Sequence, residues 1–264
     1  MESIVKVIAV KKANALVKFR QNQSMKNEQI TTYNSKGEFE TKCIAHIGDY
    51  IVTKVDVNGN IPEGEHENTW VMRQDTFERT YLKISQELAR PIPEERRFEI
   101  ATKDGSLMAP WGEKQIIRKG DYIFRSDNGN EDYVVSMNEF SSTYDVLQVE
   151  YEGYKFRNLT PHRINLISGT GSELFHIDSY GVVRLHENKE VLKQIGEINI
   201  NHKRYLEAEG LPDMVYNDAN VCNTYYIVSA LVANAIDRDD LLIVDDTVRN
   251  EKGQIIGCKA FARV

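Results

Sequence analysis

The residues best suited to bind a ligand lie in the last hundred positions of the chain. Ser229 stands between a β-branched, aromatic run at 224–228 and a segment of helix formers that begins at Ala230. This place suits a helix N-cap, whose free backbone N–H groups and positive dipole end attract phosphate or carboxylate. A nucleophile elbow would need glycines two residues to either side, where this chain has Ile227 and Leu231. We therefore expect Ser229 and Ala230 to contact an anion rather than to catalyse a reaction.

Five further residues complete the expected site. His162 opens a predicted strand, where its imidazole would face a ligand, and Thr160 lies two residues earlier. Arg249 and Arg263 are candidate counter-charges, and Tyr226 is placed to stack on a base. Each has a plainer alternative: His162 would fix the start of its strand, and Arg249 would pair with a neighbouring aspartate.

Common catalytic, metal and cofactor motifs are missing from the chain. It contains no CxxC, HExxH, GxGxxG or Walker A pattern, so neither a cofactor nor a metal is expected. Cys43, Cys222 and Cys258 are odd in number and far apart, which favours a reducing compartment over a disulfide scaffold. Cys258 lies in a predicted strand without a visible base, so we expect a buried thiol rather than a nucleophile.

Composition narrows the setting in which such a site would work. The 264 residues carry a net charge of −7, and their 41% hydrophobic and 28% charged residues are typical of globular proteins. An acidic chain is unsuited to nucleic acid or to an anionic membrane. The longest apolar run, at 225–236, is too short to span a bilayer, and the first residues lack a signal-peptide pattern. These observations predict a cytoplasmic protein with neither a nucleic-acid nor a membrane partner.

The elements that must position the candidate residues are mostly strands. In the last third of the chain, alternating apolar residues and glycine turns predict strands at 163–167, 174–178, 182–186, 224–228, 241–244 and 254–262. One main helix is expected at 229–236. The stretch 188–200 is ambiguous, because its apolar spacing fits a helix whereas Gly196 disfavours one.

Three signatures in this region follow one another in a recognisable order. They are Leu-Thr-Pro-His at 159–162, Tyr-Ile-Val-Ser-Ala-Leu-Val-Ala at 226–233, and an Arg249 turn followed by Gly257-Cys258. Together they resemble a family of small phage and actinobacterial proteins, with a longer insertion near 189–220. The resemblance implies a phage or prophage source, and it carries no assigned reaction.

The first half of the chain contains an internal repeat. Gly48-Asp-Tyr-Ile51 recurs as Gly120-Asp-Tyr-Ile123, and in each copy an aromatic residue precedes a phenylalanine by seven positions (Trp70–Phe77 and Tyr133–Phe140). The connection inside the first copy is nine residues longer and rich in Gly, Asn and Glu, as a solvent loop would be. A duplication explains this pattern better than coincidence does.

Each copy is expected to fold as strands and a short helix. Asp75 and Asn138 stand where helix N-caps would, which predicts helical turns at 76–84 and 139–146. The Phe and Tyr four residues apart in each turn then share one face and pack it on the strands. The glycine of Gly-Asp-Tyr is expected at a turn with positive φ. The pattern resembles the PGDYG family of small phage and bacterial domains, which has no settled activity.

These expectations define an α+β, β-rich fold in three parts: two small repeated α+β units and a C-terminal mixed-sheet domain with one main helix. The first unit is placed at 1–90, together with N-terminal strands, and the second at 96–150. The C-terminal domain is placed at 157–264. A proline-containing linker at 89–95 is expected to separate the first two.

The function expected from the sequence is binding. A phage-type cytosolic protein without a catalytic signature would sequester a small anionic, nucleotide-derived ligand, such as a host immune signal, in an anti-defence role. Two alternatives stay open. One is an enzyme that acts on a nucleotide or an NAD-derived metabolite, and the other is a protein-interaction module that binds a host factor. A homo-oligomer is possible in each case.

Overall fold

The computed structural model describes residues 4–33, 36–110, 112, 114–126, 129–217, 219 and 221–264. These ranges contain twenty-two strands and three helices of six or seven residues. The expectation of a β-rich fold is therefore confirmed. None of these helices has the length and apolar character needed to cross a bilayer.

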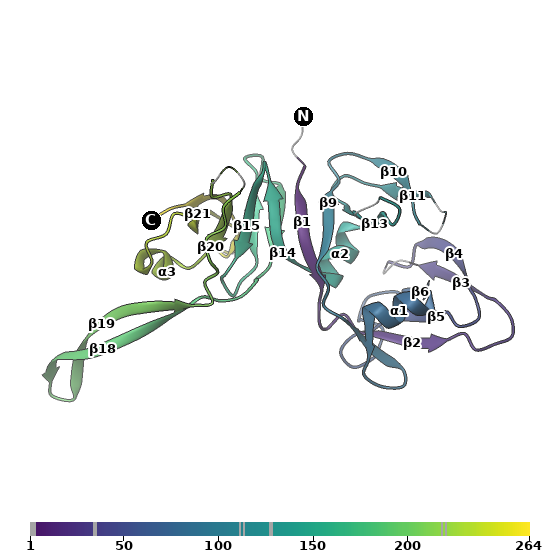
Figure 1. Ribbon diagram of the computed structural model, residues 1–264, viewed down its shortest axis with the longest axis horizontal. Helices are drawn as coiled ribbons and strands as arrows, with labels where there is room; N and C mark the ends of the chain where they lie inside the picture. The colour runs from purple at the N-terminus through teal and green to yellow at the C-terminus, as the bar shows by residue number, and fades with distance from the viewer. Residues whose placement is uncertain are drawn as a thin grey trace.

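Eleven strands form the largest sheet (Figure 1). They are, in chain order, β1 (Lys6–Lys11), β9 (Arg96–Ile100), β12 (Tyr122–Phe124), β13 (Tyr133–Val135), β14 (Tyr144–Tyr151), β15 (Tyr154–Asn158), β16 (Ile164–Ile167), β17 (Glu173–Ile177), β20 (Thr224–Ile227), β21 (Leu241–Arg249) and β22 (Ile255–Ala262). Their order across the sheet is β13-β12-β9-β1-β14-β15-β20-β21-β22-β16-β17. The sheet is mixed, because β20 runs parallel to both β15 and β21.

The remaining elements of the first half form a smaller sheet, two hairpins and two helices. The smaller sheet contains β2 (Val17–Gln21), β5 (Tyr50–Lys54), β6 (Thr69–Met72), β7 (Tyr81–Lys83) and β8 (Leu88–Pro91). The hairpins pair β3 (Glu28–Tyr33) with β4 (Phe39–Ala45), and β10 (Gly105–Met108) with β11 (Lys114–Ile117). The helices are α1 (Gln74–Thr80) and α2 (Met137–Thr143).

One five-strand order occurs in both sheets. The smaller sheet reads β6-β5-β2-β8-β7, and the corresponding part of the larger sheet reads β13-β12-β9-β1-β14. The N-terminal strand β1, expected with the first unit, pairs instead with β9 and β14. In the smaller sheet β8 fills the equivalent position, and its Pro91 pairs with Tyr81. Part of the expected linker at 89–95 is therefore strand, and the connection between the sheets is shorter than expected.

A column of three rings fills the core of each unit. Tyr50 stacks on Phe77 with ring centroids 4.1 Å apart, and Phe77 stacks on Tyr81 at 5.3 Å. The second unit has the same two contacts, at 3.5 and 5.0 Å, among Tyr122, Phe140 and Tyr144. The aromatic residues of the repeat therefore pack the helices on the strands, as expected. The turns also agree, since Gly48 and Gly120 both have a φ of +92°.

The two short helices begin earlier than the sequence suggested. α1 follows Arg73, and α2 follows Ser136, whose hydroxyl accepts a bond from a backbone N–H of the first turn. Asp75 and Asn138 lie inside these turns, so the prediction that they are N-caps is wrong. In the second unit the physical reason is visible: the Asp121 carboxylate of Gly-Asp-Tyr already accepts the first helical N–H at 3.2 Å.

The C-terminal part of the larger sheet curves so strongly that its edge strand β17 lies beside β14. The Asp178 N–H donates to the Val146 carbonyl at 2.9 Å, and the Val146 N–H donates to Asp178 Oδ2 at 2.8 Å. Inside this curve, Phe156 stacks with three other rings at centroid distances of 5.8–6.5 Å. The thiol of Cys258 is buried in the same core, as expected, and burial raises its pKa to about 11. A protonated, enclosed thiol is unsuited to nucleophilic attack.

A long hairpin leaves the C-terminal part (Figure 1). It consists of β18 (Arg184–Ile195) and β19 (Ile198–Glu209). Leu185 and Ala208 pack against a core cluster at its base, and nearly all residues beyond them are exposed. The helical interpretation of 188–200 is wrong, because the strands pair throughout around Gly196, which has a φ of +59°. We call this hairpin, residues 184–209, the arm.

Candidate functional site

Ser229 caps the helix α3 (Ala230–Ala235), as expected. Its Oγ accepts a hydrogen bond from the Val232 N–H at 3.4 Å. The helix has only six residues, and Val232 is buried in a core cluster that includes Leu159. The capping bond and the apolar packing account for Ser229 and Ala230 without a ligand.

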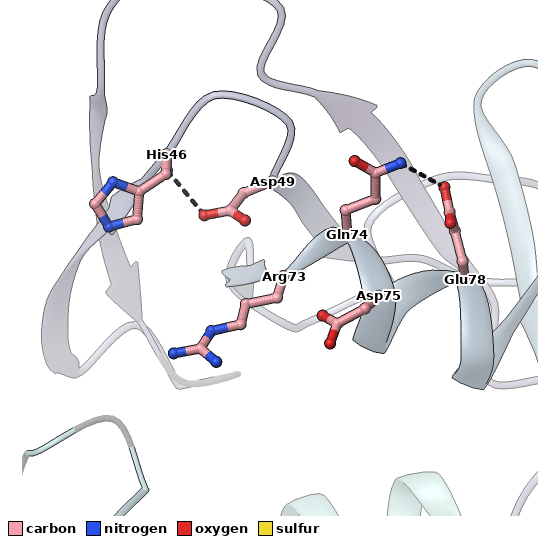
Figure 2. A pocket seen from close by; sticks show the side chains of 6 residues that line it. All are labelled: His46, Asp49, Arg73, Gln74, Asp75 and Glu78. Atoms are coloured by element: carbon pink, nitrogen blue, oxygen red, sulfur yellow. Dashed lines mark hydrogen bonds between the residues drawn. The ribbon is translucent and has the colours of Figure 1, made fainter.

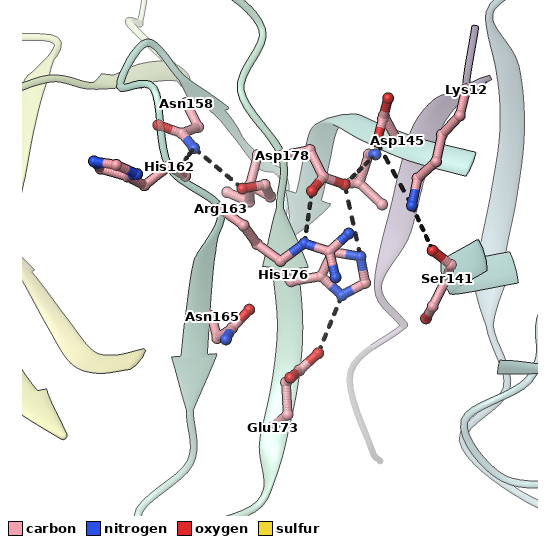
Figure 3. Close-up of polar contacts among 12 residues, drawn as sticks. Lys12, Ser141, Asp145, Asn158, His162, Arg163, Asn165, Glu173, His176 and Asp178 are labelled. Atoms are coloured by element: carbon pink, nitrogen blue, oxygen red, sulfur yellow. Dashed lines mark hydrogen bonds and ion pairs between the residues drawn. The ribbon is translucent and has the colours of Figure 1, made fainter. Parts of the chain in front are cut away.

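Asn158 organises the loop that carries Thr160 and His162 (Figure 3). Its Nδ2 donates to the carbonyls of His162 and Ile177, at 2.6 and 3.1 Å. Its Oδ1 accepts from the Thr160 N–H and hydroxyl, at 2.9 and 2.7 Å. The Thr160 side chain is therefore committed to this turn. The His162 ring is exposed and points away from Arg163, His176 and Asp178.

Tyr226 belongs to the core instead of a binding face. The residue is 1% exposed, and its hydroxyl donates to the Asp213 carbonyl at 3.3 Å. The Arg238 guanidinium lies 5.9 Å from the ring centroid and pairs with the fully buried Asp240. No side of the Tyr226 ring is left for stacking on a base, because neighbours cover it.

Arg249 and Arg263 lie at opposite ends of the β21–β22 hairpin. Arg249 is paired with Ile255 beside the turn, whereas Arg263 follows the last residue of β22. At 3.3 Å per residue, roughly 20 Å of strand separates them. Arg249 donates to the Gly253 carbonyl at 2.7 Å instead of pairing with a neighbouring aspartate, and Arg263 pairs with Asp239.

The structure brings together only part of the site expected from the sequence. Because β15 and β20 run parallel, the loops that follow them lie at the same end of the strands. These loops carry Thr160, His162 and Ser229. Tyr226 is buried within β20 below these loops, and Arg249 lies far from them at the last residue of β21. None of the expected residues lines either of the two cavities described below.

A buried histidine that the sequence did not single out lies between two carboxylates (Figure 3). His176 Nδ1 is 3.1 Å from Glu173 Oε1, and its Nε2 is 3.8 Å from Asp178 Oδ2 without a hydrogen-bond partner of its own. The His176 contact lowers the pKa of Glu173. Arg163 donates to Asp178 at 2.6 Å. This network joins the residue before β16 to β17 and, through Asp178, to β14, and it lines neither described cavity.

The largest described cavity is a cleft of about 1820 Å³ between the smaller sheet and the second unit. Its walls come from both copies of the repeat, including α1, α2 and both hairpins. Figure 1 shows these elements facing one another. One lysine bridges the two walls: Lys54 lies 2.8 Å from Glu65 in the first unit and 3.6 Å from Glu139 in the second.

Two cations and three phenols from both units gather in this cleft. The Lys11 ammonium donates to the Tyr81 hydroxyl at 2.8 Å and lies 4.6 Å from the Tyr81 ring centroid. Tyr144 is the cross-strand partner of Lys11 and so lies on the same face of the sheet. Arg96, on the neighbouring strand, donates to the Tyr133 hydroxyl at 3.2 Å. We call these five residues the cleft cluster.

The electrostatics of the cleft cluster favour an anion. Burial, together with the neighbouring Tyr133, raises the pKa of Tyr144 well above its usual value, so its hydroxyl stays neutral. Burial would lower the pKa of Arg96, but Tyr133, Tyr144 and Glu94 outweigh it and the pKa rises, so the guanidinium stays charged. Within the described ranges no carboxylate pairs with the half-buried Lys11. Its ammonium keeps two donors beyond the bond to Tyr81.

The wider lining of the cleft is also more basic than the protein as a whole. Among the described residues that line it, eleven are Lys or Arg and nine are Asp or Glu, whereas the whole chain carries a net charge of −7. Several of the carboxylates already have partners, such as Glu94 on Arg96 and Glu65 on Lys54. Cations are therefore at least as numerous as carboxylates among the described lining residues.

A smaller cavity of about 430 Å³ adjoins the first Gly-Asp-Tyr turn (Figure 2). The Asp49 carboxylate is used within the turn, where it accepts the His46 N–H at 2.8 Å. Gln74 donates to Glu78 at 3.0 Å, and Arg73 extends toward the His46 side. Gln74 and Glu78 bond each other and Asp49 closes its own turn, so we place the candidate site in the larger cleft.

The chain matched nothing in comparisons with protein-family models, with curated proteins and with solved structures. The resemblances to the PGDYG family and to the phage and actinobacterial family therefore stay predictions. Sequence reasoning missed the cleft cluster, although one signal was present. Tyr81 and Tyr144 end the repeated Phe-x-x-Thr-Tyr pattern, and the lysine and arginine beside them come from distant strands.

Proposed function

We propose that the protein binds a small anionic, nucleotide-like ligand in the cleft between its two repeated units and holds it unchanged. The observation that carries the proposal is Lys11. Among the described residues this half-buried ammonium hydrogen-bonds only to the Tyr81 hydroxyl, so it has donors left and no ion-pair partner. A bound phosphate or carboxylate would supply the missing negative charge.

The lining of the cleft supports a ligand with both charge and aromatic character. Trp70 and Phe124 also line the cleft, and the Arg96 guanidinium lies over the Phe124 ring, so rings and cations are offered together. Small-molecule sites are commonly about 300–1,000 Å³. At about 1820 Å³ the cleft has room for a nucleotide or dinucleotide in part of its volume. Sequestration of a host signal by a phage-type protein, the role expected from the sequence, would take place in this cleft.

Binding is tested by thermal unfolding with ATP, NAD and a cyclic dinucleotide, and with inorganic phosphate as a simple anion. A ligand present at 100 times its Kd stabilises a protein by about 2.7 kcal/mol, which is roughly 5–10 °C in a chain of this size. We expect at least one nucleotide to raise Tm by this order. The recovered nucleotide is then analysed by mass spectrometry, and we expect it to be unaltered.

Two lysines of β1 provide matched variants. Lys11→Met removes the cleft ammonium, and loss of a charge-assisted bond should weaken binding about 10–100-fold. Lys6→Met changes the same residue type on the same strand, but Lys6 pairs with Glu150 and does not line the cleft. Equal affinity of the two variants would contradict the assigned site. An altered nucleotide would indicate an enzyme, and no Tm shift with any probe would refute the proposal.

A further inference from the structure

The arm lacks the packing that a two-stranded ribbon ordinarily needs. An isolated hairpin is marginally stable in water, and three or more strands or a packed face are required for independent stability. Only the base of the arm, at Leu185 and Ala208, touches a core cluster. Beyond it, β18 pairs with β19 alone, so each strand has one unpaired edge along twelve residues.

Apolar side chains gather toward the end of the arm. Ile195 and Ile198 form a cross-strand pair, and Ile200 lies on the same face as Ile198. Val191 and Leu192 follow along β18. These five side chains are 44–68% exposed. Leu192 has no cross-strand partner, because the register passes directly from Val191 to Lys193. Exposed aliphatic residues beside free strand edges are the usual mark of a contact surface.

The charges of the arm suit a second arm better than they suit an acidic or basic partner. Residues 184–209 contain five Lys or Arg and five Glu, so the arm is neutral in a chain whose net charge is −7. Two copies can therefore meet at the arm without the repulsion that their bodies would impose. Glu187 is paired with Lys189 and Lys203. Within the described ranges Glu190 and Lys193 make no ion pair.

We propose that the arm joins two copies of this chain by antiparallel pairing of their β18 edges. The register that places Val191 opposite Leu192 of the second copy also places Glu190 opposite Lys193, and the two-fold axis produces this ion pair twice. Glu190, Lys193 and Ile195 lie on one face, because the extra residue Leu192 shifts the alternation. The product is a four-stranded sheet in which Val191 and Leu192 of the two copies lie side by side at its centre.

The proposal is tested by sedimentation velocity of the full chain over a concentration series. We expect a dimer, and we expect Glu190→Lys and Lys193→Glu each to weaken it about tenfold or more, because each variant sets like charges opposite one another twice. The double variant E190K/K193E exchanges the two charges and should restore the dimer. Glu197→Lys makes the same charge change at the turn of the arm and should leave dimerisation unchanged.

Unchanged melting of the body would show that the variants fold, because the arm lies outside the core clusters except at its base. A monomer at every concentration would refute the proposal. It would also be refuted by a dimer that tolerates Glu190→Lys, or by a double variant that stays dissociated. The test uses no ligand, so its result is independent of the binding proposed for the cleft.

Discussion

Asn158 shows how one buried side chain can hold three segments together. It is fully buried, and both polar groups of its side-chain amide are hydrogen-bonded. Nδ2 donates to two carbonyls, and Oδ1 accepts from Thr160. These bonds tie the end of β15 to the following loop and to Ile177 of β17. A buried amide without such partners would be costly, so this pattern fixes the local geometry.

Replacing Asn158 by alanine should destabilise the protein by about 2–4 kcal/mol, because the carbonyls of His162 and Ile177 and the Thr160 N–H lose their partner. Asn158→Asp keeps the acceptor but turns a carboxylate oxygen toward the carbonyls of His162 and Ile177 at a fully buried position, so it should cost at least as much as the alanine variant. The measurement is the free energy of unfolding from urea denaturation.

Asn165→Ala provides the control for this prediction, because Asn165 makes one exposed bond to the Ile256 carbonyl. Its loss should cost about 0.5–1.5 kcal/mol. If the two alanine variants proved equally stable, the role assigned to Asn158 would be wrong.

At the scale of elements, turns are closed by carboxylates that accept several hydrogen bonds. In the connection from β12 to β13, Asp132 accepts from Arg125 at 2.8 Å and from the N–H and hydroxyl of Ser126 at 2.9 and 3.0 Å. Burial alone would raise the pKa of Asp132, but these bonds outweigh it and the pKa is lowered. The turn is therefore held together by the charged form of the carboxylate.

The stabilisation supplied by Asp132 should depend on pH. Its folded pKa lies below the usual 3.8, so its contribution is complete well above pH 3.8 and is lost as pH falls through the folded pKa. Asp132→Asn should cost about 1 kcal/mol at pH 7, a small value because Arg125 is partly exposed. Urea denaturation from pH 7 to pH 3 should show the difference between the two proteins narrowing on the acid side. A difference that grows toward pH 3 would contradict this account.

At the scale of the whole molecule, the chain contributes its first strand to the larger sheet, then forms the smaller sheet, and then returns to the larger one. β1 pairs with β9 on one side and β14 on the other, although the first unit lies between them in sequence. Val7 and Ala9 are buried in the same core cluster as Phe98 and Val146. The second unit is therefore incomplete without β1.

Ala9→Asp places a charge at a position with no exposed surface and should open the second unit first. Hydrogen exchange followed by mass spectrometry should show faster exchange in β9 and β14 before β2 and β5 respond. Asn14→Asp, in the exposed connection after β1, should leave the pattern unchanged. Equal acceleration in both sheets would show that β1 does not belong to the second unit alone.

Local chemistry decided the features that the sequence predicted well. The Gly-Asp-Tyr turns, the ring contacts around Phe77 and Phe140, and the cap at Ser229 each depend on residues close in sequence or on one repeated pattern. The helical interpretation of 188–200 failed because apolar spacing on two exposed strands can imitate a helix.

Only the tertiary structure decided where a binding site could lie. Ser229, Thr160 and Arg249 looked functional by type, yet a helix cap, a turn and a bond to the Gly253 carbonyl already use them. Lys11, Tyr81, Arg96 and Tyr144 look ordinary in sequence and meet because β1 inserts between β9 and β14. Side-chain type and spacing along a chain determine local turns and caps, whereas a cleft between two sheets depends on contacts between strands far apart in sequence.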